Sequence, residues 1–130
     1  MKILLAGSGD LAQRIPPKLS DQHQYFGLKR QPINLSNGIT PLVGDLTDVA
    51  CLDRIFREDF DVVVATLTPD SATEEGYQKA YVDSAAALSR AINNADHKPK
   101  LVIWVSSTSV YGQSSGSWVD EDSPANSTTF

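Results

Sequence analysis

The chain opens with Met-Lys-Ile-Leu-Leu-Ala-Gly-Ser-Gly-Asp-Leu-Ala (residues 1–12), and this stretch decides the fold class. Residues 3–6 form an apolar run without a polar break, which is typical of a parallel strand buried on both faces. The pattern G-x-G-x-x-A follows at once, at Gly7, Gly9 and Ala12. We therefore predict a strand, a glycine turn and the start of a helix, in that order.

This order of elements forms a phosphate cradle, because the first N–H groups of a helix lack partners and carry partial positive charge. Gly7 allows the tight turn, Gly9 lets a pyrophosphate approach the backbone, and Ala12 keeps the helix close to the strand. Leu11, Ala12 and Ile15 can begin an amphipathic helix. The motif predicts a dinucleotide site, and a tight turn without a ligand is the alternative.

Asp10 and Leu11 complete the candidate contacts at this turn. Asp10 adds negative charge, which counts against a bound anion. Alternatively, its side chain points away and caps the helix. We predict that both residues contact the cofactor.

Composition limits the classes of protein that fit. A chain of 130 residues, 41% hydrophobic and 21% charged, is typical of one globular domain. The net charge of −5 argues against a nucleic-acid or anionic-membrane partner. Cys51 is the only cysteine, which fits a cytoplasmic protein. No apolar run is long enough for a signal peptide or a membrane span. His23 and His97 lack metal-site spacing, so we expect no metal.

Strands and helices alternate along the rest of the chain. We predict strands at residues 24–29, 41–43, 61–66 and 101–106, with a loop at 30–40. One helix is expected at 49–58, capped by Asp48, with Leu52, Ile55 and Phe56 on one face. A longer helix is expected from Thr73, its cap, to about Asn94, with Tyr77, Tyr81, Ala85 and Leu88 on one face.

This alternation predicts an α/β, Rossmann-type, doubly wound parallel sheet of about five strands in three layers. We assign residues 1–112 to a dinucleotide-binding domain and 113–130 to a polar loop. Ligands of such a sheet bind at the carboxyl ends of the strands.

The end of the second strand bears on the identity of the cofactor. An NAD site usually has an acidic residue about 20 residues past the glycines, to bind the ribose 2′-hydroxyl. Lys29 stands 20 positions after Gly9, Arg30 follows it, and no carboxylate is there. A basic pair suits a 2′-phosphate and favours NADP over NAD. The alternative is a solvated strand end without a ligand.

Gly44-Asp-Leu-Thr-Asp48 is a polar turn after the third strand. We predict that Asp45 accepts a hydrogen bond from the adenine amino group and that Leu46 packs on the ring. The alternative, a turn followed by an N-cap, needs only Asp48 and is compatible with this role.

The run Ser106-Ser-Thr-Ser-Val-Tyr-Gly112 places four hydroxyl residues at the end of a buried strand. We predict that Ser106 contacts the cofactor and that Thr108 and Tyr111 contact the substrate. A hydroxyl by itself is not a base, so the chemistry needs a neighbour with a lowered pKa. The alternative for Tyr111, and the more common role of such a residue, is to shape the loop.

Together these motifs, with Asp120-Glu-Asp-Ser-Pro124 after them, resemble the extended short-chain dehydrogenase/reductases. The nucleotide-sugar epimerases and dehydratases are the most similar members, and the likeness covers the N-terminal part of such a protein. The resemblance implies that Ser107 is the active-site Ser/Thr and that Asp45 and Leu46 contact adenine. It also implies that Ala65 and Thr66 lie beside the cofactor. A small nucleotide-sugar-like substrate is expected, and a homodimer is left open.

The sequence also departs from that family. Its usual G-x-x-G-x-x-G would fall on Ala6, Gly9 and Ala12, and no Tyr-x-x-x-Lys follows Ser107. That pair would supply the proton-transfer tyrosine and the lysine that lowers its pKa. We therefore expect that this chain stops before the catalytic tyrosine and is inactive by itself, although the full-length protein is an NAD(P)-dependent enzyme. The alternative is a natural short protein, a non-catalytic NAD(P)-binding sensor or regulator.

Overall fold

Five parallel strands form a single sheet in the order β3-β2-β1-β4-β5 within the part of the chain that the structure describes. The computed structural model describes residues 1–19, 22–31, 35, 38–105, 112, 113 and 115–126. The strands are β1 (Lys2–Ala6), β2 (Gln24–Lys29), β3 (Ile39–Val43), β4 (Val62–Thr66) and β5 (Leu101–Val105). The predicted α/β class and parallel sheet are confirmed.

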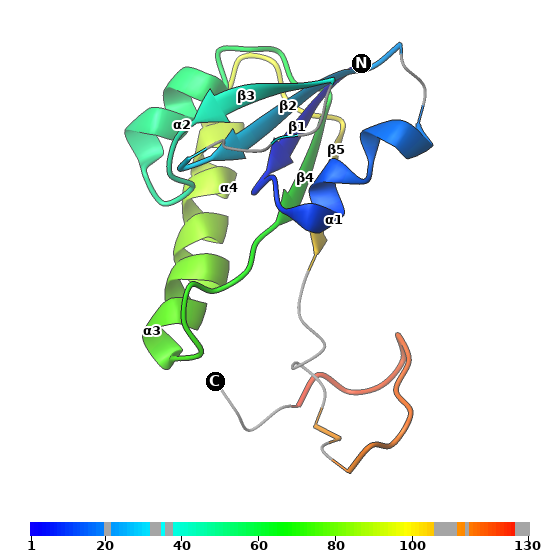
Figure 1. Ribbon diagram of the computed structural model, residues 1–130. Coiled ribbons are helices and arrows are strands. Elements are labelled where there is room, and N and C mark those ends of the chain that lie inside the picture. Colours follow the sequence, from blue (N-terminus) through cyan, green and yellow to red (C-terminus); the bar gives the residue numbers. More distant parts are fainter. Residues whose placement is uncertain (20–21, 32–34, 36–37, 106–111, 114, 127–130) are drawn as a thin grey trace.

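Helices cover both faces of the sheet, so the molecule has three layers (Figure 1). One face carries α1 (Asp10–Gln13) and the short 3₁₀ helix η1 (Pro16–Lys18). The other face carries α2 (Val49–Ile55) and a continuous helical segment made of α3 (Glu74–Tyr77), η2 (Gln78–Asp83) and α4 (Ser84–Asn94). None of the helices described is long and apolar enough to span a membrane.

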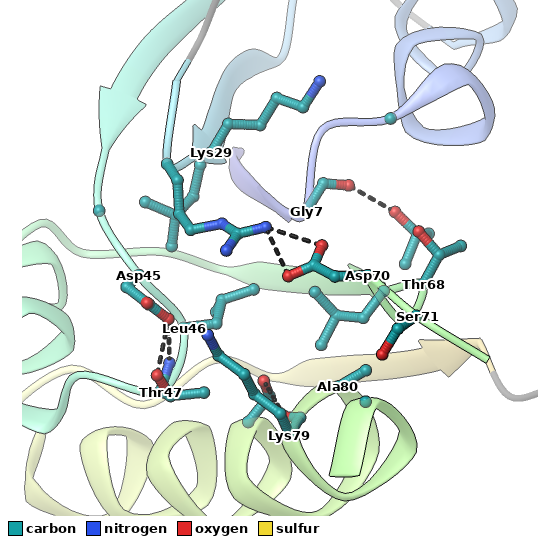
Figure 2. A pocket seen from close by; sticks show the side chains of 18 of the residues that line it. Gly7, Lys29, Asp45, Leu46, Thr47, Thr68, Asp70, Ser71, Lys79 and Ala80 are labelled. Atoms are coloured by element: carbon teal, nitrogen blue, oxygen red, sulfur yellow. Dashed lines mark hydrogen bonds and ion pairs between the residues drawn. The ribbon is translucent and has the colours of Figure 1, made fainter. Parts of the chain in front are cut away.

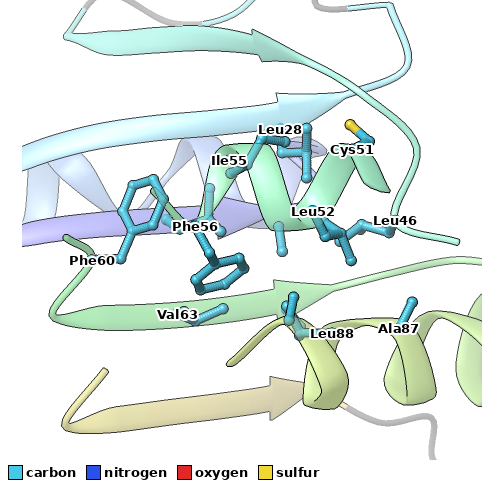
Figure 3. Packing of buried hydrophobic residues seen from close by; sticks show 14 residues of the cluster. Leu28, Leu46, Cys51, Leu52, Ile55, Phe56, Phe60, Val63, Ala87 and Leu88 are labelled. Carbon is cyan, nitrogen blue, oxygen red and sulfur yellow. The ribbon is translucent and has the colours of Figure 1, made fainter. Parts of the chain in front are cut away.

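The sheet is buried because β1 contributes to an apolar cluster on each face. Leu4 packs with Leu52, Phe56 and other residues of α2 and α4 in one cluster (Figure 3). Leu5 packs on the opposite face, in the cluster that includes Ala12 of α1. An apolar run without alternation is the sequence of a strand covered on both sides, as predicted from residues 3–6.

The helix after the glycine turn is shorter than its apolar pattern suggests. The α1 helix has a single turn, and the chain continues from Pro16 as η1. Pro16 and Pro17 lack the N–H groups that a continued α-helix needs, which ends the helix. Of the apolar residues expected to form one face, Ala12 is buried but Leu11 is 55% exposed.

The long helix over residues 74–94 is confirmed, with Thr73 as its cap, but a π-helical segment interrupts it. The Thr73 hydroxyl accepts a hydrogen bond from the Gly76 N–H at 3.0 Å. Within η2 each hydrogen bond spans five residues, which rotates the part of the helix that follows. Of the predicted face, Leu88 is buried and Tyr77, Tyr81 and Ala85 are half-buried, whereas the buried residues of α4 are Ser84, Ala87, Leu88 and Ala91.

Other boundaries differ by a few residues. The β3 strand begins at Ile39 inside the predicted loop, and Pro41 is tolerated because β3 is an edge strand. The α2 helix ends at Ile55, earlier than predicted, and Leu52, Ile55 and Phe56 are buried together as expected. Residues 112–126, in their described part, contain no helix or strand, as predicted for the tail.

The prediction that the fifth strand is buried was wrong. Among the residues that the structure describes, β5 is the other edge of the sheet, and Leu101 and Ile103 are 50% and 43% exposed. An apolar run identifies a strand but not its position in the sheet.

Candidate functional site

The carboxyl ends of β1, β2, β3 and β4 meet at one edge of the sheet and open into a cavity of about 510 Å³. This volume is within the range of small-molecule and cofactor sites, about 300–1,000 Å³. Seven of the predicted cofactor residues line it: Gly7, Gly9, Lys29, Arg30, Asp45, Leu46 and Thr66. The sequence thus located the cavity correctly from the ends of four strands.

Gly7 is fixed by the packing of the turn. Its φ is +83°, and a Cβ there would lie 2.7 Å from the Thr66 carbonyl oxygen. The Thr66 hydroxyl donates a hydrogen bond to the Gly7 carbonyl at 2.6 Å, which joins the ends of β1 and β4. The N–H groups of Gly7 and Ser8 both donate to the Leu28 carbonyl, at 3.0 and 3.2 Å. The turn is therefore held against both neighbouring strands.

Gly9 differs from Gly7 because nothing surrounds it. Its φ of −81° is open to any residue, and a Cβ there would meet no atom within 4 Å. Packing therefore does not require a glycine at this position. The open space lies at the N-cap of α1, where the following N–H groups have no acceptor within the helix. A glycine here keeps the backbone accessible to a group from outside the fold.

Three predicted contacts lie outside the wall of the cavity. Asp10 is paired with Arg14 at 3.0 Å and does not cap α1, whose N-cap is Gly9. Leu11 is largely exposed, and Ala65 is buried within the sheet. An i,i+4 ion pair on the helix surface accounts for the position of Asp10.

The two basic residues at the end of β2, Lys29 and Arg30, have different surroundings (Figure 2). The Arg30 guanidinium Nη2 contacts both carboxylate oxygens of Asp70, at 2.8 and 2.9 Å. The hydrogen bond and the charge of Asp70 raise the pKa of Arg30. The Lys29 side chain extends away from this ion pair. No local pattern around Arg30 indicates that a carboxylate binds it, because Asp70 is 40 positions away.

The turn after β3 holds Asp45 in a fixed orientation. Asp45 Oδ1 accepts hydrogen bonds from the Thr47 N–H at 2.8 Å and from the Thr47 hydroxyl at 2.7 Å. These bonds lower the pKa of Asp45, and the charges of Lys79 and Arg30 act in the same direction. Asp48 caps α2 through Ala50 and Cys51, at 3.1 and 3.3 Å. The structure therefore contains the turn with its N-cap, and it places Asp45 on the cavity wall as well.

The opposite wall contains residues that sequence reasoning missed. They come from the loop after β4 and from the α3–η2–α4 segment, and they include Leu67, Asp70, Ser71, Glu75, Lys79 and Ala80. The strand-end rule indicates the loop after β4 but not which of its side chains face the cavity. Lys79 and Ala80 belong to the π-helical segment, in which the Ser84 hydroxyl donates to the Lys79 carbonyl at 3.0 Å. No local sequence signal identified that segment.

The predicted catalytic and substrate residues Ser107, Thr108 and Tyr111, and the cofactor residue Ser106, lie outside the described residues. Val105, immediately before them, pairs with Thr66, so β5 ends at the same edge of the sheet as the cavity. Their roles stay predictions.

The spacing Tyr-x-x-x-Lys does occur once, at Tyr25 and Lys29, but not as a catalytic pair. Both residues lie on β2, where side chains four positions apart are separated by about 13 Å. Tyr25 is 5% exposed within the apolar cluster, and burial raises its pKa. A proton-transfer tyrosine needs the opposite shift.

The charges of this region do not form a metal site. Across the described part of the chain, no group of three His, Cys, Asp or Glu side chains is arranged to hold a metal ion.

Comparison with known proteins identifies the family. Residues 7–129 match the model of the NAD dependent epimerase/dehydratase family, and the chain belongs to this family. A structure from Methylobacillus flagellatus, assigned as an NAD-dependent epimerase/dehydratase, is 32% identical and superposes with a TM-score of 0.76. That match covers 99% of this chain and 45% of the other. No curated protein matches.

More distant structures share the fold. A UDP-glucose 4-epimerase is 21% identical, with a TM-score of 0.76, over 99% of this chain and 42% of that one. A UDP-glucuronic acid 4-epimerase from Bacillus cereus, solved in complex with NAD, is 22% identical with a TM-score of 0.75. That match covers 99% of this chain and 47% of the epimerase. The chain thus spans less than half the length of these proteins.

Proposed function

We propose that this chain binds NAD(P) in the cavity at the strand ends and forms the cofactor-binding part of an enzyme. The enzyme would transfer hydride to or from a nucleotide-sugar-like substrate. The open backbone at Gly9 is the observation that carries the proposal, because no neighbouring atom requires a glycine there. Family membership supplies the class of cofactor, and solved relatives include epimerases of UDP-sugars.

The residues present fit a dinucleotide. Gly7 and Gly9 would face the pyrophosphate, since a turn with free helical N–H groups attracts an anion. Lys29 and Arg30 would lie beside the ribose 2′ position, where a basic pair by itself suits the 2′-phosphate of NADP. Asp45 and Leu46 would bind adenine, with Asp45 already oriented by Thr47.

The nicotinamide supplies the redox chemistry when it is bound. Residues of this chain would exclude water from one side of the cofactor and orient the reacting oxygen. By its resemblance to the family motif, Ser107 would donate a hydrogen bond to that oxygen. The proton itself needs a separate acid–base group with a pKa tuned to the task.

The test is a calorimetric titration of the purified protein with NADPH and NADH, beside the Gly9→Val variant. Valine adopts the backbone geometry of Gly9 and has room for its side chain, so the fold should be kept. We expect the native protein to bind and the variant to bind at least about tenfold more weakly, a change of about 1.4 kcal/mol.

Gly9→Ala is the graded control, and circular dichroism establishes that each protein is folded. Absence of binding by the folded native protein, or native affinity in Gly9→Val, would overturn the assignment of the cavity. A sensor without catalysis would bind the cofactor but produce no change in nicotinamide absorbance with UDP-glucose or UDP-glucuronic acid.

A further inference from the structure

An ion pair joins two strand ends across the cofactor cavity. Arg30 follows β2 and Asp70 lies beyond the end of β4, and β1 with its glycine turn lies between these strands. The pair therefore passes over the end of β1, beside Gly7 (Figure 2). A dinucleotide that reaches both the glycine turn and Arg30 must meet Asp70 as well.

The geometry of the pair decides what Arg30 can offer a ligand. Both oxygens of Asp70 contact one terminal nitrogen, Nη2, so the carboxylate occupies one end of the planar guanidinium. A phosphate that binds Arg30 must displace this carboxylate or bind next to it. In the first case an existing charge-assisted bond is lost, and in the second two negative groups lie close together. Either arrangement weakens the binding of a 2′-phosphate.

The charge of the whole cavity reinforces this effect. Among the described residues that line it, the cations are Lys29, Arg30 and Lys79, and the anions are Asp45, Asp70 and Glu75. These formal charges cancel. Neutralising Asp70 alone would leave the lining with a net charge of +1, which favours a ligand with an additional phosphate dianion.

Asp70 also places a carboxylate where local sequence has none. An NAD site uses an acidic residue at the end of the second strand to accept a hydrogen bond from the ribose 2′-hydroxyl. Lys29 and Arg30 hold those positions, yet the Asp70 carboxylate lies within 3 Å of the Arg30 guanidinium. The loop after β4 therefore brings an acceptor to the same region of the cavity.

We infer that Asp70 determines the cofactor preference of this protein. It restrains Arg30, weakens the binding of a 2′-phosphate and offers an acceptor to a 2′-hydroxyl. This inference rests on the proposed function. Asp70 acts partly through Arg30, so it is a positioning residue and not a catalytic one.

The experiment measures dissociation constants of NADPH, NADH, 2′,5′-ADP and ADP for the native protein and for Asp70→Asn. The two ADP probes report on the adenosine end alone. We expect the ratio of NADPH to NADH affinity, and that of 2′,5′-ADP to ADP, to rise about three- to tenfold in Asp70→Asn. The range is modest because the pair is exposed to solvent, at 57% and 60% of the two side chains.

Two further variants isolate the cause. Glu58→Gln removes the same charge from an ion pair with Lys2, 2.8 Å long, at the opposite end of β1, and should leave both ratios unchanged. In the Arg30→Gln background, Asp70→Asn should lose the part of its effect that comes from release of the guanidinium, so the rise in both ratios should be smaller than in the native background.

Unchanged affinity ratios in Asp70→Asn, or an equal rise of the ratios in Glu58→Gln, would overturn the inference. The proposed function would still stand in that case, provided that the native protein binds the dinucleotides. Binding of none of the four ligands by the folded native protein would overturn the proposed function, and the inference with it.

Discussion

Gly7 and Gly9 belong to one motif but have different physical roles. Gly7 is required by the fold, since its positive φ and the nearby Thr66 carbonyl leave no room for a side chain. Gly9 has ordinary backbone geometry and open space around it. The motif in the sequence treats the two glycines alike, and only their surroundings show which one the packing of the fold requires.

This difference predicts that the same substitution destabilises the protein at Gly7 but not at Gly9. Gly7→Ala should lower the free energy of unfolding by about 1–3 kcal/mol, because alanine is strained at positive φ and its Cβ meets backbone. Gly9→Ala, the matched control, should change it by less than about 0.5 kcal/mol. Urea unfolding followed by circular dichroism measures both. Equal effects of the two substitutions would contradict the assigned roles.

The sequence predicted where the polar residues at the strand ends lie, but not which of them contact one another. Lys29 and Arg30 were correctly placed on the cavity, yet the ion pair from Arg30 to Asp70 joins residues 40 positions apart. Sequence spacing carries no information on such a contact, because the parallel sheet brings together the ends of strands that are distant in the chain.

Among the elements, the helical segment α3–η2–α4 has two distinctive features, a side-chain cap at its start and a π-helical turn within it. Thr73 caps it, and Glu74 and Glu75 lie in the first turn, where negative charge stabilises a helix. The π-helical turn then brings Lys79 and Ala80 to the cavity wall. The cap followed from residue type, whereas no residue pattern indicated the π turn.

The cap predicts a stability effect at one residue. Thr73→Ala should lower the free energy of unfolding by about 1 kcal/mol, since the Gly76 N–H loses its acceptor. Ser89→Ala removes a hydroxyl from an exposed position within α4 and should be neutral or slightly stabilising, because alanine favours a helix. Thermal unfolding of both variants tests this, and a neutral Thr73→Ala would show that the cap is dispensable.

At the scale of the whole molecule, the stability of the sheet rests on the layer between it and helices α2 and α4. Phe60 is fully buried there, with its ring edge-on to Phe26 and Phe56 at 5.5 and 5.7 Å between centroids. It follows α2 and precedes β4, so it joins the helical layer to the sheet. Figure 3 shows Phe60 and Phe56 together over β4.

Truncation of this ring should affect the entire fold. Phe60→Ala is expected to lower the free energy of unfolding by about 3–5 kcal/mol, a large share of the roughly 5–15 kcal/mol typical of a domain. Trp118→Ala, which removes a side chain that is 99% exposed, should leave it unchanged. Chemical denaturation of the two variants compares them. A loss below about 1 kcal/mol for Phe60→Ala would mean that this layer is not the main support.

The sequence by itself determined the strands, the glycine turn, two helix caps and the edge of the sheet at which a ligand would bind. These features depend on residue type and short-range periodicity, which act within a few positions of the chain. Only the tertiary structure decided the position of β5 in the sheet and the ion pair between Arg30 and Asp70. Both arise from contacts between segments that are distant in the chain, whose energies local sequence does not encode.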